Sequence, residues 1–337
     1  MRWLLRRLAW TCLMLLGITF VTFAVIDLAP VDRAELEVAR AAPDRAFVDR
    51  SSRDAAVMRL RVQHGMVDPV TFAPVPLWRR YGNWLVDAST LRFGGPGDDH
   101  AALWHRIGAA LPPTLLLGGL AMLLAFGVGV PIGVWLGMRA GSRTDRSVST
   151  GMLVLGSVPE FLLATLLLLA FASAWLHWLP IAGLASPGAE QWSLPARLLD
   201  LAAHLVLPVF VMAIGPTVMV SRFVREAAAR ARRAPFAEAM LAFGIDEVTR
   251  HRRLLRHAAV PAATLVGRLL PMLTGGSIVV ENLFAIDGLG HLAFSAAVDL
   301  DQPMVMATVV IGSVVTMLGF LLSDLLHRVV DPRVELS

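Results

Sequence analysis

Two ionisable side chains, Glu160 and Arg268, lie inside long apolar stretches of the sequence. From the rise of an α-helix, Glu160 lies ~20 Å along residues 148–176. By the same rise, Arg268 lies ~16 Å beyond His257. A charge in hydrocarbon is costly and by default marks a pathway for a solute or an ion. We hypothesise that both side chains line a translocation path, where they pair or meet the opposite charges of a zwitterion such as a peptide.

Structural roles compete with this hypothesis. Ser157 and Glu160 have the spacing of a capping box, with Pro159 expected at the first helical position, so the span would break there and Glu160 would cap the restarted helix. The structural alternative for Arg268 is burial against backbone carbonyls. Glu281 lies near the outer end of the apolar stretch that holds Arg268. For Glu281 a structural role at a helix end is favoured over a gate or a contact with a binding protein.

The composition excludes several kinds of catalytic or metal site. The chain has no lysine, which a phosphate-binding loop of an ATPase requires, so it holds no such loop. Cys12 is its single cysteine, so neither an intrachain disulfide nor a Cys/His metal cluster is expected. We interpret the scattered histidines His177, His204 and His291 as structural or interfacial. No residue is proposed as a catalytic acid, base or nucleophile.

The elements that position these charges are expected to be membrane-spanning helices. The chain is 56% hydrophobic with a mean hydropathy of +0.64, an excess that indicates lipid-facing surface. Six stretches have the ~20 residues that a span needs. They are residues 8–27, 107–138 (from Pro113 onward), 148–176, 201–221, 258–281 and 303–323. The uncharged run Leu8–Ile26 exceeds the apolar region of a signal peptide, so we interpret it as a retained span.

The arginines predict the orientation of these spans. They cluster before the first span, between spans two and three, in residues 222–256 and after the sixth span. By the positive-inside rule these segments, and with them both termini, are cytoplasmic. The connections 177–200 and 282–302 hold one arginine between them, Arg197, and are expected outside. An all-α integral membrane protein with six transmembrane helices follows.

Three regions are expected along the chain. Residues 1–30 form the N-terminal end and first span, 31–102 an extracytoplasmic insertion, and 103–337 a core of five helices. The insertion carries ten arginines and ten acidic residues, and long segments are translocated largely regardless of charge. A helix is expected around Asp44–Arg61. It is followed by aromatic residues suited to a membrane interface, Trp78, Tyr81 and Trp84.

Within the second span, Gly129, Gly133 and Gly137 form a G-x-x-x-G-x-x-x-G row on one helix face. Such a row lets another helix approach closely. Tight static packing is favoured here over a mobile helix interface.

The cytoplasmic segment 222–256 is expected to hold short helices. A first helix is predicted from Val224 to Arg232, and Pro235 ends it. A second is predicted from Phe236 to Phe243 with Gly244 as its C-terminal cap. A third is predicted over residues 247–257, ended by Pro261. A short helix at the tip of a basic loop suits docking to another protein, and a merely solvated loop is the alternative.

The segment Glu238-Ala239-Met240-Leu241-Ala242-Phe243-Gly244 resembles the E-A-A-x-x-x-G signature of binding-protein-dependent ABC importer permeases. Further pieces resemble the B-type permease of dipeptide, oligopeptide and nickel importers. They are Pro113-Thr114-Leu115, Ser157–Phe161, Leu179–Gly183, Arg256–Pro261, Gly275–Phe284 with Gly288-Leu289-Gly290, and Asp331-Pro332-Arg333. The chain departs from the family pattern at Phe243, where a basic residue is usual, and at Asp287, where proline is usual. It also departs in a Gly244-to-Pro261 spacing one residue shorter than expected.

The resemblance implies a type I ABC importer permease fold in a bacterial inner membrane. Glu238, Ala239 and Gly244 would couple the loop to a cytoplasmic ATPase, with Phe243 and Pro261 in the same coupling loop. Partner chains would bind ATP and magnesium, and this chain would bind no cofactor. The implied partners are ABC ATPase subunits, a second homologous permease in a heterodimer, an extracytoplasmic solute-binding protein and membrane lipid, but no nucleic acid.

Two other functions stay open from the residues alone. One is a stand-alone secondary transporter, although the sequence has no internal repeat of the kind that such transporters carry. The other is a membrane scaffold that transports nothing. For the importer, the resemblance fits peptides, nickel chelates, glutathione and opines as solutes.

Overall fold

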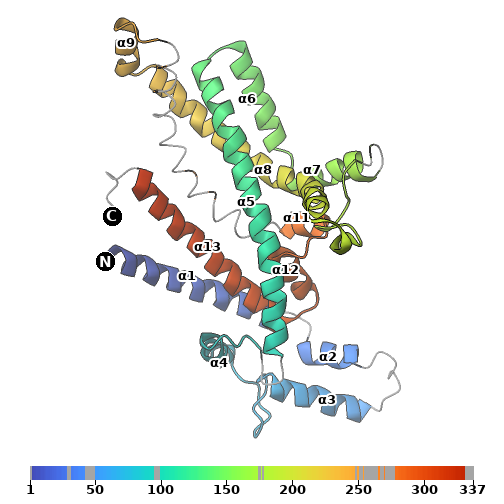
Figure 1. Cartoon of the computed structure of the whole chain (residues 1–337). Coiled ribbons are helices and arrows are strands. Elements are labelled where there is room, and N and C mark those ends of the chain that lie inside the picture. Colours follow the sequence, from blue (N-terminus) through green and yellow to red (C-terminus); the bar gives the residue numbers. More distant parts are fainter. Residues whose placement is uncertain are drawn as a thin grey trace. The chain divides into compact units, whose positions relative to one another are not determined.

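The computed structural model of the chain consists of helices and the segments that join them (Figure 1). It describes residues 2–28, 32–41, 50–94, 99–173, 176, 178–246 and 278–330, with residues 249, 253, 265 and 269 as single positions. The helices are α1 (Arg2–Asp27), α2 (Arg33–Ala41), α3 (Arg50–Gln63), α4 (Leu77–Ser89), α5 (His100–Met138), α6 (Arg143–Gly156), α7 (Glu160–Leu167), a π-helical turn (Leu168–Ser173), a 3₁₀ turn (Ala189–Gln191), α8 (Leu194–Arg232), α9 (Pro235–Ala242), α11 (Ile278–Leu283), α12 (Leu289–Val298) and α13 (Gln302–Val330). Within the described ranges no β-strand is found, only an isolated bridge between Val67 and Pro74.

Four helices of this described part, α1, α5, α8 and α13, are each long and apolar enough to cross a membrane. Helices α6 and α7 make a fifth span if the bent pair is counted as one. These helices cover five of the six predicted stretches, so the prediction of an all-helical membrane protein is confirmed. The predicted span 258–281 lies outside the described residues except at 265, 269 and 278–281. The count of six spans therefore stays a prediction.

Helix α8 is longer than the predicted fourth span. Residues 201–221 and the separate helix predicted from Val224 to Arg232 form one continuous helix, Leu194–Arg232. Pro208 and Pro216 lie inside it, which a membrane helix tolerates because neighbouring groups satisfy the freed carbonyls. The charged end of α8 is helical because no helix-breaking residue occurs between Arg222 and Arg232.

The chain forms two compact units, and the first comprises Met1–Gly108 with Leu292–Ile311. In this unit α2 and α3 pack together, and Arg61 binds Asp32 at 2.6 Å and Glu35 at 3.1 Å. Helix α4 packs on α1, where the Tyr81 hydroxyl lies 2.9 Å from the hydroxyl of Thr19. The helix predicted around Asp44–Arg61 is present from Arg50, and residues 42–49 lie outside the described part.

The second unit comprises Ala109–His291 with Gly312–Ser337, and α5 and α8 pack closely in it. A Cβ atom on Gly133 would lie 2.5 Å from the carbonyl oxygen of Ser221. One on Gly137 would lie 2.6 Å from the Arg225 carbonyl oxygen, and one on Gly129 would lie 3.0 Å from that of Thr217. The glycine row thus brings the two backbones together where any other residue would clash, which agrees with the prediction of close packing.

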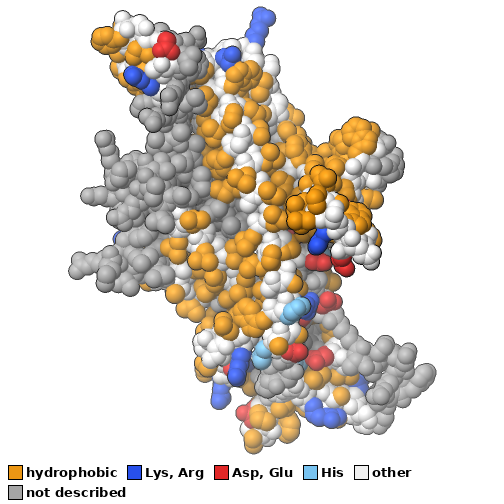
Figure 2. All heavy atoms as spheres, viewed as in Figure 1, with side chains coloured by type: hydrophobic (Ala, Val, Ile, Leu, Met, Phe, Trp, Pro, Cys, Tyr) orange, Lys and Arg blue, Asp and Glu red, His pale blue; other side chains and the backbone are white. Residues whose placement is uncertain are grey.

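Hydrophobic side chains fill the unit around this contact. A buried cluster joins Leu117 and Ala121 of α5 to Leu205 and Val211 of α8, and Phe284 after α11 lies in the same cluster. Hydrophobic side chains also cover most of the visible face of α5 in Figure 2, and arginines stand at the end where α5 joins α6. Apolar surface that faces outward along a helix is what lipid contact requires.

Candidate functional site

The short helix α9 follows the end of α8, and its own sequence defines where it begins and ends (Figure 1). Pro235 is its first residue, where a missing N–H costs no intrahelical hydrogen bond. At the other end the Ile245 N–H donates to the carbonyl of Met240 at 3.0 Å, and Gly244 has a φ of +66°. This is a Schellman ending, which places glycine in the left-handed region. The predicted helix 236–243 is confirmed, one residue earlier at each end.

Helix α9 has one buried face and one exposed face. Ala237 and Met240 are 4% and 5% exposed. They pack against Met138, Ala231, Phe236 and Ile245. Glu238 and Ala239 are exposed, and Phe243 beyond the helix is 83% exposed. A short helix held from behind, with a carboxylate and an aromatic ring in front, has the form of a docking element for another protein.

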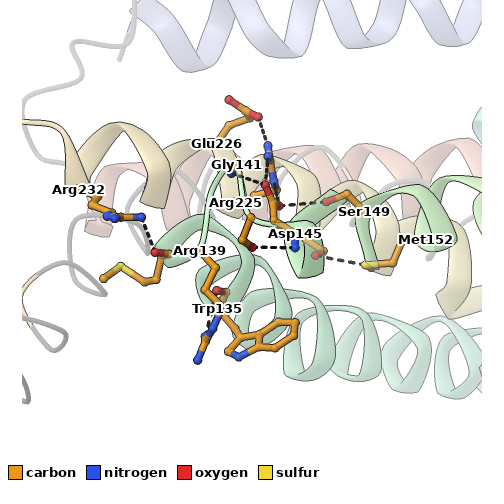
Figure 3. A network of polar contacts seen from close by, with 12 residues as sticks. Trp135, Arg139, Gly141, Asp145, Ser149, Met152, Arg225, Glu226 and Arg232 are labelled. Atoms are coloured by element: carbon orange, nitrogen blue, oxygen red, sulfur yellow. Dashed lines mark hydrogen bonds and ion pairs between the residues drawn. The ribbon is translucent and has the colours of Figure 1, made fainter. Parts of the chain in front are cut away.

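The end of α5 also holds α9 in place. Met138, the last residue of α5, belongs to the apolar cluster under α9. Its carbonyl accepts a hydrogen bond of 2.6 Å from Nη1 of Arg232, the last residue of α8 (Figure 3). A force on α9 therefore reaches α5 and α8 together.

An ion pair with a buried carboxylate lies next to this contact. Arg225 of α8 donates from Nε to Oδ1 and from Nη2 to Oδ2 of Asp145, each at 2.6 Å. The Asp145 side chain is 1% exposed and also accepts hydrogen bonds from the Gly141 N–H at 2.9 Å and the Ser149 hydroxyl at 3.3 Å (Figure 3). Asp145 lies in the first turn of α6, and its two oxygens meet two N–H groups of one guanidinium, the bidentate geometry of a carboxylate bound to arginine.

Part of the predicted coupling loop lies outside the described residues. This applies to Pro261 and to most of the helix predicted over 247–257, of which Thr249 and Arg253 are described singly as helical. The structure therefore brings Glu238 and Ala239 together on α9, with Phe243 and Gly244 in the turn that ends it, and does not describe Pro261.

The predicted break in the third span is present. Helix α6 ends at Gly156, α7 begins at Glu160, and the two are bent by 93°. The capping-box prediction is wrong for Ser157, because its hydroxyl donates to the carbonyl of Val154 at 2.8 Å at the end of α6. Pro159 holds the N-cap position of α7 without a side-chain hydrogen bond. The Glu160 side chain is exposed, and Arg268 lies outside the described residues.

Glu281 is fully buried and caps a helix end. Its carboxylate accepts a hydrogen bond from the Thr114 hydroxyl at 2.8 Å and from the His291 N–H at 2.9 Å. Thr114 in turn accepts from the Leu289 N–H at 2.7 Å. Because Leu289 is the first residue of α12, the two side chains satisfy N–H groups that have no partner within that helix. A Cβ on Gly288 would lie 2.4 Å from the Glu281 carboxylate, so glycine is needed there.

We expect Glu281→Ala to lower the free energy of unfolding by about 1–3 kcal/mol, because it removes the acceptor of the His291 N–H in α12 and the shorter of the two hydrogen bonds donated by the Thr114 hydroxyl. Thermal unfolding of the purified protein in mild detergent measures this change. Asp287→Ala removes an exposed carboxylate six residues further along and is the control, with an expected effect below about 0.5 kcal/mol. Equal stability of the two variants would contradict the capping role.

The sequence did not indicate the partners of two of these carboxylates. Ser142 and Asp145 have the S-x-x-D spacing of a helix start, and the Asp145 N–H does donate to the Ser142 hydroxyl at 3.1 Å. That signal locates the start of α6 but not the contact with Arg225. Thr114 belongs to the segment Pro113-Thr114-Leu115, and nothing local relates it to Glu281.

Comparisons with known proteins agree on one family. Residues 129–336 match the family described as "Binding-protein-dependent transport system inner membrane component". The chain is 32% identical to a putative peptide permease protein of Brucella ovis, with all of both chains aligned. It is 29% identical to the oligopeptide transport system permease protein AppB of Bacillus subtilis over 99% of each chain. It is also 28% identical to the metal-staphylopine import system permease protein CntB of Staphylococcus aureus, over 77% of this chain and 78% of that protein.

Proposed function

The chain belongs to the family of binding-protein-dependent transport system inner membrane components, and from this premise we propose how it works. It is a permease subunit of an ATP-binding-cassette importer. A separate ATPase docks on α9, and its closure on ATP shifts the permease between outward and inward access. The proposal is carried by the exposed Glu238 and Ala239 on α9 and the exposed Phe243 just after it, while the opposite face of α9 packs on α5 and α8.

ATP chemistry is assigned to the partner and not to this chain. A phosphate-binding loop needs a lysine, and the sequence has none. ATP and magnesium would be held by the docked ATPase, and this chain would receive only the movement. Gly244 supports the docking helix by allowing its left-handed ending at φ +66°.

We propose a peptide as the transported solute. Two relatives that align over 99% or more of this chain are named as peptide and oligopeptide permeases, and a third is named for peptidoglycan transport. A relative aligned over 77% of this chain is named for a metal–staphylopine complex. A small metal chelate is therefore the second candidate solute.

A six-span topology with both termini in the cytoplasm is proposed for a bacterial inner membrane. It is supported by the long apolar helices and by the arginines in the turn between α5 and α6 and at the end of α8. Residues 31–102 would then form the extracytoplasmic insertion. A second homologous permease and a solute-binding protein would complete the assembly, as in other importers of this family.

Uptake into proteoliposomes tests this function. The chain would be reconstituted with a second permease and ATPase subunits from the same organism, and labelled peptide would be supplied with the solute-binding protein. We expect uptake that requires ATP and the ATPase subunits. Uptake driven by an ion gradient in their absence would favour a secondary transporter, and absence of uptake under all conditions would favour a scaffold.

For the proposed translocation path, we expect Arg268→Gln to change the rate of peptide uptake several-fold while the complex still assembles. The reason is that a charge inside the membrane is retained where it meets a solute or a partner charge. Uptake rate and the yield of intact complex are measured side by side. Arg197→Gln is the control, because Arg197 is exposed in the first turns of α8, at the end expected outside the membrane. Normal uptake by the Arg268 variant would remove this residue from the path.

A further inference from the structure

The contact between α6 and α8 differs from the contact between α5 and α8. The glycine row leaves no room between α5 and α8. Between α6 and α8, by contrast, lies a cavity of about 750 Å³. Its lining includes Ser149 and Leu153 of α6 and Val218 and Arg222 of α8. Apolar packing therefore fixes α5 to α8, but it does not by itself fix the first half of α6.

The ion pair between Asp145 and Arg225 spans α6 and α8 beside this cavity, and both residues contribute to its lining. A bidentate pair between a guanidinium and a carboxylate holds its partners in one orientation as well as at one distance. Asp145 also accepts from Gly141 in the turn before α6, so the turn is held by the same carboxylate. At the other end of α6, Gly156 approaches Val218, where an added Cβ would lie 3.2 Å from that side chain.

Stability alone gives little reason for an ion pair here, where the Asp145 side chain is 1% exposed and the Arg225 side chain 24%. Burying a carboxylate is costly, and replacing a buried pair by apolar residues of similar volume is often neutral or stabilising. What apolar residues lack is the directional contact. The position of the pair then becomes informative, because Arg225 lies on the part of α8 that leads to α9, seven residues before Arg232.

We propose that Asp145 and Arg225 are positioning residues of the transport cycle. They hold the start of the third span, at the beginning of α6, against the arm of α8, by which we mean residues 225–232 that lead to α9. The inference rests on the proposed docking of an ATPase on α9. With the pair intact, the end of α5, helix α6 and the arm of α8 move as one body when the ATPase closes. This rigid group of helices ends at the 93° bend between α6 and α7, where Ser157–Pro159 separate the two helices. The movement that starts at the ATPase is therefore transmitted to the bend in the third span.

The test uses the complete importer in proteoliposomes, with wild type, Asp145→Asn, Arg225→Lys and the apolar pair Asp145→Leu with Arg225→Met. Three quantities are measured for each: ATPase bound per permease, thermal midpoint of the complex, and peptide imported per ATP hydrolysed. Glu226→Gln is the control, because Glu226 contacts Arg225 from an exposed position on the same helix.

We expect all variants to bind the ATPase as wild type does. Import per ATP should fall by about tenfold for Asp145→Asn and for the apolar pair, less for Arg225→Lys, and not for the control.

The apolar pair separates a positioning role from a structural one. If the ion pair only stabilises the fold, the apolar pair will restore both the thermal midpoint and import per ATP, and the proposal is overturned. It is also overturned if variants lose the ATPase and thermal stability together, or if Asp145→Asn imports normally. A wild-type chain that binds no ATPase would instead overturn the proposed function on which this inference rests.

Discussion

A chain that carries Glu238→Arg together with Gly244→Asp is expected to lose ATP-driven uptake, by about 100-fold or more, while its membrane helices stay folded. Glu238 is exposed on α9, so reversing its charge alters the docking face and not the packing beneath it. Gly244 has a φ of +66°, a conformation that costs roughly 1–2 kcal/mol for a residue with a side chain. Its replacement therefore loosens the end of α9. Both changes lie in the proposed docking face, and a few central residues of an interface carry most of its binding energy.

A matched control exists in the same chain. Gly188 has a φ of +81° and is followed two residues later by the exposed Glu190, in a connection expected on the opposite side of the membrane. Gly188→Asp with Glu190→Arg introduces the same backbone strain and the same charge reversal away from α9. We expect this control to import at nearly the wild-type rate. Equal loss of uptake in both double variants would show that docking on α9 is not the cause.

The second large effect is expected for Gly133→Leu in the second span. A Cβ at this position would lie 2.5 Å from the Ser221 carbonyl oxygen and 2.8 Å from Cβ of Val224, so even alanine forces α5 and α8 apart. Overpacking of a tight interior costs about 1–3 kcal/mol or more, and the larger leucine side chain adds to this. We expect a thermal midpoint lower by many degrees and little assembled complex, measured by thermal unfolding in detergent and by size-exclusion chromatography.

Gly127 provides the control, because it lies on the same helix and an added Cβ there would meet no atom of the described residues within 4 Å. Gly127→Leu should leave the thermal midpoint and the yield of complex close to wild type. If Gly133→Leu also assembles normally, the close approach of α5 and α8 is not a feature of the working importer.

The spans and the docking helix could be predicted because their signals are local. Long apolar stretches indicate spans regardless of the rest of the chain. The ends of α9 follow from a proline and a glycine that act on their own backbone, Pro235 and Gly244. The glycine row is equally local, since residues four apart share a helix face.

The ion pair and the cap could not be predicted in this way. Arg225 and Asp145 are 80 positions apart, and Glu281 and Thr114 are 167 positions apart. Such contacts depend on how helices are placed in space, which composition and periodicity do not encode. The error at Ser157 has a related cause: its hydroxyl has carbonyl partners at the end of one helix and N–H partners at the start of the next, and spacing alone does not choose between them.

The most direct test of the central claim is co-purification of a partner ATPase in mild detergent. Tagged wild type would be compared with the double variant Glu238→Arg, Gly244→Asp, with bound proteins identified and ATP hydrolysis assayed. We predict that an ATPase is recovered with wild type and is lost from a double variant that remains folded. If no ATPase binds to wild type under conditions that keep it folded, or if the double variant binds it equally well, α9 is not the site at which an ATPase drives this permease.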